Sequence, residues 1–380
     1  MTVLDLSSVG PASRASRLLA DYGAEVVKVA PTAKKGAVQI KPVFYAYGAG
    51  RGMKRVRIDL KTEEGKAAFF RLIEKADVLI ESFRPGVAER IGIGYEACRR
   101  RNKAIVYCST SGYGQTGPAS KWAGHDINYL AMGGFMHCSG RRGDGGPAIP
   151  GATVADSAAG GMQAVIAIMA ALLRRADSGE GEYLDVAVAD GVLQLMSLHI
   201  DRYLATGESA GPGGDVLTGR YAYYDVYQAQ DGKWLSVGAI EPAFYANLCK
   251  ALGCDEFLDD QNNDERQDAI RSAFTAAFKT KDRDQWVAEL APNDTCVAPV
   301  YDMAELAGDE HLEARGVFAQ ARDDEHGTFK QLGPVWAGCD RDVPVHDIRP
   351  DRETDTQDLL LRAGASQEEV DGLMAAGAVE

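Results

Sequence analysis

An alternation of short apolar runs with amphipathic segments is the feature that most constrains the fold of this chain. Residues 2–6 and 25–29 are apolar, and between them residues 14–22 repeat apolar side chains at helical spacing. Parallel strands need a crossover of a dozen or more residues, usually a helix, so the pattern predicts an α/β fold with an open, Rossmann-like parallel sheet. The expected strands are residues 2–6, 25–29, 55–60, 78–80, 104–107 and 183–188.

A glycine-rich stretch, residues 207–219, divides the chain and is expected to be a linker. We expect a large domain over residues 1–206 and a smaller α+β domain over 219–330, with a C-terminal segment over 331–380. The expected helices are residues 14–22, 62–76, 86–90, 95–101, 125–135, 156–175, 242–252, 264–279, 283–290, 354–362 and 366–375, and a hairpin is expected around residues 231–232.

The charge of the chain is unevenly distributed. The total is −14, which argues against general nucleic-acid binding because a polyanion is gripped by a basic face. Residues 1–103, however, hold 20 Lys and Arg against 11 Asp and Glu, a balance of +9. This quarter of the chain is suited to an anionic ligand, unless the bases are clustered by chance on solvated helix faces.

The spacing of the cysteines, of the histidines and of the apolar residues indicates where in the cell the protein is expected and whether it binds a metal. The 7 cysteines form no CxxC pair and the N-terminus lacks the features of a signal peptide, so a cytoplasmic protein with reduced thiols is expected. The 6 histidines show neither HxH nor HExxH spacing, which makes a protein-built metal site unexpected. The longest apolar run, residues 164–173, is far shorter than a membrane span.

One glycine motif, Gly112-Tyr-Gly-Gln-Thr-Gly117, matches the dinucleotide fingerprint GxGxxG but lacks its context. Pro118 follows directly, no amphipathic helix opens there, and the motif follows a late strand rather than the first one. We therefore interpret it as a structural turn.

Four acid–base residues stand at the starts of expected helices. His125 and Asp126 lie in Gly124-His-Asp-Ile-Asn-Tyr129, Asp156 begins a helix rich in glycine and alanine, and Glu241 directly precedes Pro242. Helix starts stabilise negative charge, which suits such groups for catalysis. A structural histidine and two ordinary N-cap acids are the alternative interpretation.

Basic side chains near the expected strand ends are candidates for binding an anion with several phosphates, because open α/β sheets bind ligands at the carboxyl ends of their strands. Scattered surface charge is the alternative. These residues are Arg51, Lys54, Arg55, Arg57, Lys61, Arg84 and Arg90.

Taken together, these segments resemble the class III CoA-transferase family and, within it, the 2-methylacyl-CoA racemases. The resemblance runs nearly from end to end. The segments that carry it are Leu18-Leu-Ala-Asp-Tyr-Gly-Ala-Glu-Val-Val-Lys28, Glu81-Ser-Phe-Arg-Pro-Gly-Val87, Ser111-Gly-Tyr-Gly-Gln-Thr-Gly-Pro118, Gly124-His-Asp-Ile-Asn-Tyr-Leu130, Gly238-Ala-Ile-Glu-Pro-Ala-Phe-Tyr245 and Asp294-Thr-Cys-Val-Ala-Pro-Val300.

The resemblance implies a Rossmann-like large domain, a smaller second domain and a C-terminal segment that returns to the large one. It also implies an interlocked homodimer whose sites lie between the large domain of one chain and the small domain of the other. Matching motifs place the two proton-transfer groups on His125 and Asp156 and a supporting carboxylate on Glu241. The CoA contacts would be Arg51, Leu60, Lys61, Phe83, Arg84, Arg90, Gly124, Asp126 and Tyr129.

The implied activity is inversion of the α-carbon of a 2-methyl-branched acyl-CoA by 1,1-proton transfer through an enolate, with backbone N–H groups near the Asp156 helix start holding the enolate oxygen. No metal or redox cofactor is expected beyond the CoA of the substrate. A class III CoA-transferase that forms an aspartyl-CoA thioester on Asp156 is the main alternative, although such transferases generally lack the histidine of the Gly-His-Asp motif. A CoA-binding protein without catalysis is a third possibility.

Three departures from the racemase pattern bear on that choice. Asp156 is followed by Ser-Ala-Ala-Gly, which is closer to the transferases. Residues 218–224 read Thr-Gly-Arg-Tyr-Ala-Tyr-Tyr, so Arg220 is expected to favour a more polar acyl group if this segment lines the acyl pocket. The first helix carries Arg14 and Arg17 where smaller or apolar residues are expected.

Overall fold

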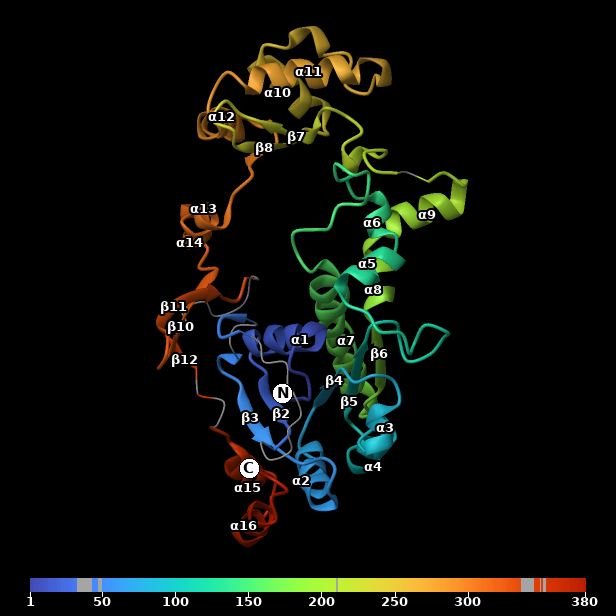
Figure 1. The fold of residues 1–380 in the computed structure, drawn as a ribbon, viewed down its shortest axis with the longest axis vertical. Coiled ribbons are helices and arrows are strands. Elements are labelled where there is room, and N and C mark those ends of the chain that lie inside the picture. The colour runs from blue at the N-terminus through green and yellow to red at the C-terminus, as the bar shows by residue number, and fades with distance from the viewer. Residues whose placement is uncertain (33–42, 47–49, 210, 336–344, 349, 351–352) are drawn as a thin grey trace. The chain divides into compact units, whose positions relative to one another are not determined.

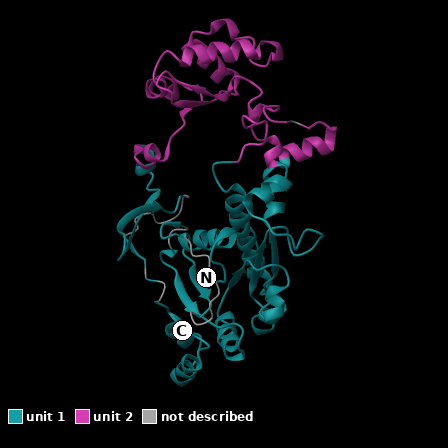
Figure 2. Ribbon diagram, viewed as in Figure 1, with its two compact units in different colours: residues 1–134, 150–197, 311–380 teal, residues 135–149, 198–310 magenta. Residues whose placement is uncertain are grey.

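The structure is a computed structural model that describes residues 1–32, 43–46, 50–209, 211–335, 345–348, 350 and 353–380 (Figure 1). The chain forms two compact units (Figure 2). Unit 1 consists of residues 1–134, 150–197 and 311–380, and unit 2 of residues 135–149 and 198–310.

Unit 1 contains the predicted parallel sheet, with six strands in the order β3-β2-β1-β4-β5-β6. Every neighbouring pair is parallel, and this order is that of the Rossmann fold, which confirms the α/β prediction. The strands are β1 (Thr2–Asp5), β2 (Glu25–Ala30), β3 (Lys54–Arg57), β4 (Val78–Glu81), β5 (Val106–Ser111) and β6 (Tyr183–Ala187).

The helices of the first 206 residues follow the strands much as the sequence predicts. They are α1 (Gly10–Asp21), α2 (Glu63–Ile73), α3 (Val87–Ile91), α4 (Tyr95–Arg101), α5 (Asp126–Met132), α6 (Phe135–Cys138), η3 (Ala155–Met162), α7 (Gln163–Ser178), α8 (Val188–Leu195) and α9 (Ser197–Thr206). Of these, α6 and nearly all of α9 belong to unit 2. The sequence did not indicate α8 or α9, because the chain turns from β6 straight into a helix without a glycine or proline between them.

Both faces of the sheet are covered, so successive strand residues enter different cores. In β1, Leu4 belongs to the buried cluster that includes Phe69 of α2. Its neighbour Val3 belongs to the cluster that includes Leu19 of α1 and Ile168 of α7. Burial on both faces explains why these strands are continuous apolar runs in the sequence rather than alternating ones.

The segment η3 is a π-helix that packs closely against α1 and α8. A Cβ atom at Gly160 would lie 2.6 Å from the Pro11 Cβ, and one at Gly191 would lie 2.1 Å from the Ala159 carbonyl oxygen. The small residues that the sequence shows here therefore permit backbone-to-backbone packing. π-Helical segments within helices are frequent at functional sites, and this one carries Asp156.

One helix among the described residues, Ala155–Ser178, is long and apolar enough to cross a membrane, with a mean hydropathy of 1.5 in its most apolar window. Length and composition are the only basis for this possibility. Ala164, Ile168 and Ala171 of this helix are buried in the core of unit 1, as in the core helices of many proteins that span no membrane.

Unit 2 has an antiparallel sheet in the order β7-β8-β9, covered by helices. The predicted hairpin and the three predicted helices are present, and Phe274, Phe278 and Trp286 lie in one buried cluster. The elements are β7 (Tyr224–Gln228), β8 (Trp234–Gly238), α10 (Pro242–Leu252), α11 (Gln267–Phe278), α12 (Arg283–Leu290), β9 (Val297–Pro299), α13 (Met303–Ala307) and α14 (Glu310–Ala314), the last of which continues into unit 1.

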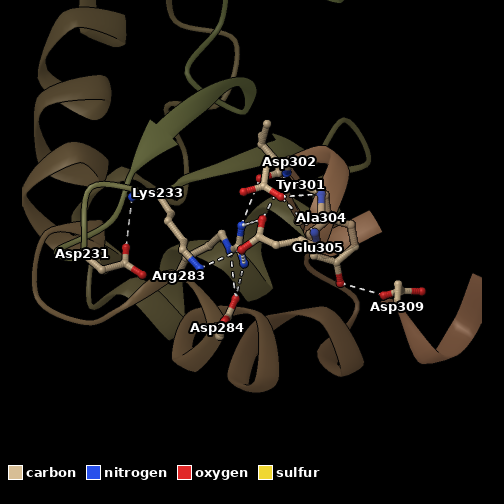
Figure 3. A network of polar contacts seen from close by, with 10 residues as sticks. Asp231, Lys233, Arg283, Asp284, Tyr301, Asp302, Ala304, Glu305 and Asp309 are labelled. Carbon is tan, nitrogen blue, oxygen red and sulfur yellow. Dashed lines mark hydrogen bonds and ion pairs between the residues drawn. The ribbon is translucent and has the colours of Figure 1, made fainter. Parts of the chain in front are cut away.

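A buried arginine fixes the segment through which the chain leaves this unit (Figure 3). Arg283 of α12 is 2% exposed, and its Nη2 lies 2.8 Å from Oε1 of Glu305 on α13. Lys233 reaches the same Glu305 oxygen at 2.7 Å. Hydrogen bonds from Arg283 and Lys233 hold the pKa of Glu305 well below its usual range, so this carboxylate stays charged.

The C-terminal segment returns to unit 1 through α15 (Thr356–Arg362) and α16 (Gln367–Ala375). The Arg55 N–H donates to Asp355 Oδ2 at 2.8 Å, and Arg362 pairs with Glu25 at 3.0 Å. The three-stranded sheet of β10 (Phe318–Asp323), β11 (Gly327–Leu332) and β12 (His346–Asp347) also belongs to unit 1. The second unit therefore ends at residue 310, whereas the sequence placed the end of the small domain at 330.

Substituting Gly191 tests the close packing of η3. Gly191→Ala is expected to lower the free energy of unfolding by about 1–3 kcal/mol, because its Cβ meets a backbone carbonyl that cannot move aside. Chemical denaturation measures this change. Gly372→Ala on α16 is the matched control, since its Cβ meets nothing within 4 Å and helical alanine is favoured over glycine. Equal stability of Gly191→Ala and wild type would contradict the close packing.

Candidate active site

The carboxyl ends of the six parallel strands form one edge of the sheet, and β1 and β4 are neighbours at the point where the strand order reverses. Ligands of open α/β sheets bind outside this edge. Lys61 follows β3, Phe83 and Arg84 follow β4, and the loop that leads to His125 follows β5. The topology therefore gathers most of the predicted site residues at one edge.

His125 is held at the start of α5 by its backbone. Its φ and ψ of −130° and 176° are extended, and its N–H donates to Asn128 Oδ1 at 3.0 Å. The imidazole itself is exposed. A fixed backbone and an accessible ring are what a proton-transfer group requires.

Aromatic rings fix the loop before His125. The Tyr129 hydroxyl donates to the Gly124 carbonyl at 2.6 Å, and the Tyr113 ring packs edge-on against Tyr129 with centroids 5.1 Å apart. A Cβ at Gly112 would lie 2.5 Å from the Tyr129 oxygen, and one at Gly124 would lie 2.8 Å from the Tyr113 oxygen. The glycine motif after β5 is thus a turn that packs against these rings, as its context in the sequence predicted.

A hydrogen bond between η3 and α5 links Asp156 to the segment that carries His125. The backbone N–H of Asp156 donates to Asp126 Oδ1 at 2.8 Å. Burial raises the pKa of Asp156, and the nearby charge of Asp126 raises it further, whereas Arg14 and His125 lower it. Asp156 thus lies within electrostatic reach of His125, and a raised pKa favours its proton-donating form.

This arrangement removes one of the backbone N–H groups near the Asp156 helix start from the candidates for holding the enolate oxygen. The Asp156 N–H at the start of its helix already has an acceptor in Asp126, so it is not free to bind a substrate oxygen. In the described parts of the chain, the backbone N–H groups of Asp126 and Ile127 have no protein acceptor. These two donors lie directly beside His125.

Three predicted CoA contacts are exposed cations at or beyond the ends of strands. Lys61, Arg84 and Arg90 are exposed, and none has an acidic partner among the residues that the structure describes. Leu60 and Phe83 are partly buried against the core of unit 1. Because they are exposed and lack acidic partners in the described chain, the three cations are available to bind the phosphates of a ligand.

Arg51 differs from these three, because its guanidinium is used inside the protein. The residue is 3% exposed; its Nη2 lies 3.2 Å from Asp21 Oδ1 and its Nη1 donates to Gln331 Oε1 at 3.1 Å. In this structure Arg51 connects α1 to β11. A contact between its side chain and CoA, which the sequence suggested, would require these bonds to break.

Glu241 belongs to unit 2, whereas His125 and Asp156 lie together within unit 1. Glu241 is the N-cap of α10 before Pro242, and its exposed side chain makes no cap hydrogen bond. The loop before it is fixed by Gln261, whose Nε2 donates to the Ile240 carbonyl at 2.8 Å. The carboxylate of Glu241 is therefore presented by a fixed backbone and is available to a partner.

Arg220 is also engaged, which argues against the expectation that it selects a polar acyl group. Its guanidinium binds both oxygens of Asp264, at 2.9 and 2.8 Å, and lies over the Tyr221 ring at 5.1 Å. Tyr221 and Tyr223 are themselves buried and stacked. A carboxylate on a substrate would have to displace Asp264.

A buried acid that the sequence did not single out supports the loop of Phe83 and Arg84. Glu81, at the end of β4, is 3% exposed and accepts hydrogen bonds from the Phe83 N–H at 2.6 Å and from the Ser109 hydroxyl. Burial raises the pKa of Glu81 to about 7. One feature of the sequence could have indicated it, namely an acid that directly follows the apolar residues of a predicted strand.

Arg14, noted in the sequence only as a departure, supports the Asp156 side of the site. Its Nη2 donates to Thr153 Oγ1 at 2.7 Å, three residues before Asp156.

A separate surface pocket of about 610 Å³ lies beside α3 and α4, lined among others by Glu89, Tyr95 and Gln115. Within the described residues, no group of three or more His, Cys, Asp and Glu could hold a metal ion.

Comparison with known proteins places these residues in a family context. A family model, CoA-transferase family III, matches residues 1–356. Alpha-methylacyl-CoA racemases of Homo sapiens and Mus musculus are 32% and 34% identical, over 97% of this chain and 94% and 93% of theirs. The acetyl-CoA:oxalate CoA-transferase of Acetobacter aceti is 31% identical over 84% of this chain and 85% of its own.

A solved structure shows the same fold. The CAIB/BAIF family protein from Brucella suis superposes with a TM-score of 0.73 at 29% identity, covering 96% of this chain and 97% of that one. The curated relatives include both racemases and CoA-transferases, so similarity by itself leaves the reaction open.

The pH dependence of stability tests the burial of Glu81. Because folding raises its pKa from 4.5 to about 7, the native protein binds more protons than the unfolded chain in this window, and this carboxyl makes stability fall as pH rises through it. Glu81→Gln should therefore show a smaller loss of melting temperature between these pH values. The exposed Glu64→Gln, on α2, should keep the wild-type dependence; the same dependence in Glu81→Gln would contradict this interpretation.

Proposed function

Because this chain belongs to CoA-transferase family III, we propose that it is an acyl-CoA racemase or epimerase that inverts the α-carbon of a 2-methyl-branched acyl-CoA thioester. The observation that carries the proposal is the meeting of His125 and Asp156 in one site, where Asp126 joins the two segments. The proposal also rests on the similarity to racemases over nearly the whole chain.

The proposed reaction needs only the two groups found together. A thioester α-proton is weakly acidic, so its removal requires a positioned base and a stabilised enolate. Neutral His125 takes the proton from one face of the α-carbon, and protonated Asp156 returns a proton to the other face. The opposite epimer reacts through the reverse transfers, from the form with imidazolium and carboxylate. The chemistry requires no cofactor beyond the CoA of the substrate.

The enolate oxygen has candidate donors beside the base. We assign it to the backbone N–H groups of Asp126 and Ile127, which have no acceptor within the described protein. Donors that are fixed in advance stabilise a developing negative charge without reorganisation. The Asp156 N–H is not part of this assignment, because Asp126 already accepts its hydrogen bond.

Glu241 is proposed to orient His125 from the second chain of an interlocked homodimer. The exposed apolar side chains of α7 support a partner there: Ile166, Met169 and Leu173 are 59%, 45% and 71% exposed. Contiguous apolar surface of this kind marks interaction sites. A cytoplasmic location is part of the same proposal.

The CoA moiety is assigned to the carboxyl edge of the sheet. Lys61, Arg84 and Arg90 would hold its phosphates, because they are exposed cations without acidic partners in the described chain. Gly124 and Tyr129 would lie beside the pantetheine arm that delivers the thioester to His125.

CoA transfer between carboxylic acids is the second candidate. Here the Asp156 carboxylate attacks the thioester carbonyl and expels the CoA thiolate, which then attacks the resulting anhydride to give an aspartyl-CoA thioester and the free acid. The transferase relatives favour it, as does the Ser-Ala-Ala-Gly run after Asp156. The exposed His125 beside Asp156 has no role in that sequence of steps, and this favours racemisation.

Exchange of the α-proton distinguishes the two reactions. In D2O, with a 2-methylacyl-CoA and no acceptor acid, the wild-type enzyme should replace the α-proton by deuterium while the epimers interconvert, as followed by NMR. His125→Ala should lose exchange by about two orders of magnitude or more, because a general base contributes roughly 10²–10⁴-fold, and should still bind CoA. CoA found on an added carboxylate, with no exchange, would establish the transferase instead.

The salt dependence of CoA affinity tests the phosphate assignment. Arg84→Ala and Arg90→Ala should each raise the dissociation constant for CoA by roughly fivefold at low salt and flatten its dependence on salt, because each removes a charge-assisted contact. Isothermal titration measures both effects. Lys75→Ala, an exposed cation beyond the end of α2, is the control and should bind like wild type. Unchanged affinity in both arginine variants would contradict the assignment.

A further inference from the structure

The Asp126 carboxylate connects the two groups proposed for proton transfer. Asp126 follows His125 directly in the chain and begins α5. Its Oδ1 accepts the backbone N–H of Asp156, 30 residues later in the sequence, at 2.8 Å. The side chain is only partly exposed, so this contact lies in the site rather than on the open surface.

The charges that act on Asp156 come from the elements packed against η3. From α1, Arg14 favours the charged form of Asp156, and so does His125 at the start of α5. Asp126 opposes that form, after the larger effect of burial. Among the charged groups described around Asp156, Asp126 is the negative one.

Two further groups near η3 complete this environment. Tyr129 of α5 lies close enough for the charges of Asp156 and Asp126 to affect it, but burial raises the pKa of its phenol to about 12, so it stays neutral. Asp190 in the first turn of α8 interacts with Asp185 rather than with Asp156. Asp126 is therefore the neighbour whose charge can be removed to test its effect on Asp156.

We infer that Asp126 is a positioning residue for proton transfer: its carboxylate holds the Asp156 backbone beside His125 and opposes a second negative charge there. This inference rests on the proposed racemase function. It goes beyond the CoA contact that the sequence suggested for Asp126, because a CoA contact would change affinity without changing the protonation of Asp156.

The consequence concerns the two forms of the resting enzyme. One form has neutral His125 and protonated Asp156, and it converts one epimer by taking a proton at His125 and giving one from Asp156. That turnover leaves imidazolium and carboxylate, the form that converts the other epimer. The charge at position 126 favours the first form, because two adjacent carboxylates resist being ionised together.

The pH dependence of turnover tests this inference. Asp126→Asn keeps an oxygen that can accept the Asp156 N–H and removes the charge. In this variant the acid limb of kcat/KM for α-proton exchange should move to lower pH by about 0.5–1 unit, because Asp156 then loses its proton more readily. Asp126→Glu keeps the charge and should restore the limb close to its wild-type position while kcat falls. Asp358→Asn on α15 is the control for loss of a carboxylate and should leave both limbs unchanged.

A second measurement does not depend on activity. In the full-length protein labelled with carboxyl-¹³C aspartate, the resonance that is absent from Asp156→Asn reports the titration of Asp156. Its midpoint should be lower in Asp126→Asn than in wild type and unchanged in Asp358→Asn. An unchanged midpoint, or a loss of CoA affinity with unchanged pH limbs, would overturn the inference. If wild-type enzyme shows no exchange, the proposed function fails, and the titration still decides the role of Asp126.

Discussion

The hydrogen bond from the Asp156 N–H to the Asp126 carboxylate joins the two segments of unit 1 that carry the proposed catalytic groups, η3 and the start of α5. On one side, the loop after β5 reaches His125 through glycines packed against Tyr113 and Tyr129. On the other side, a π-helical segment carries Asp156 and packs closely on α1 and α8 because its glycines leave room for backbone contact. The parallel sheet places both starts near the edge where α/β folds bind ligands.

The basic residues in the first quarter of this acidic protein fall into two groups. Some of those bases are used within unit 1: Arg51 pairs with Asp21, and Arg71 pairs with Glu369 of the returning C-terminal segment. Lys61, Arg84 and Arg90 have no such partner in the described chain and remain available to an anion. The charge balance of a segment therefore indicates an anionic ligand only after the internal ion pairs have been separated from the free cations.

The sheet could be predicted from the sequence, since strands such as residues 78–80 are buried on both faces and read as apolar runs. The hairpin of β10 and β11 could not, because its strands mix polar and apolar residues, as in Phe-Ala-Gln-Ala-Arg-Asp. Motifs indicated His125 and Asp156, but the contact between residues 126 and 156, the π-helix and the burial of Arg51 depend on tertiary packing. No local pattern in the sequence specifies such long-range contacts.

The central claim is that His125 and Asp156 act on one carbon atom from opposite sides. A crystal structure of the full-length protein with a CoA thioester that mimics the planar enolate tests it most directly. The claim predicts an imidazole nitrogen and an Asp156 carboxylate oxygen on opposite faces of the α-carbon, each about 3–3.5 Å away, as near-attack geometry requires. Asp156 placed against the thioester carbonyl carbon, with His125 remote from the α-carbon, would contradict it.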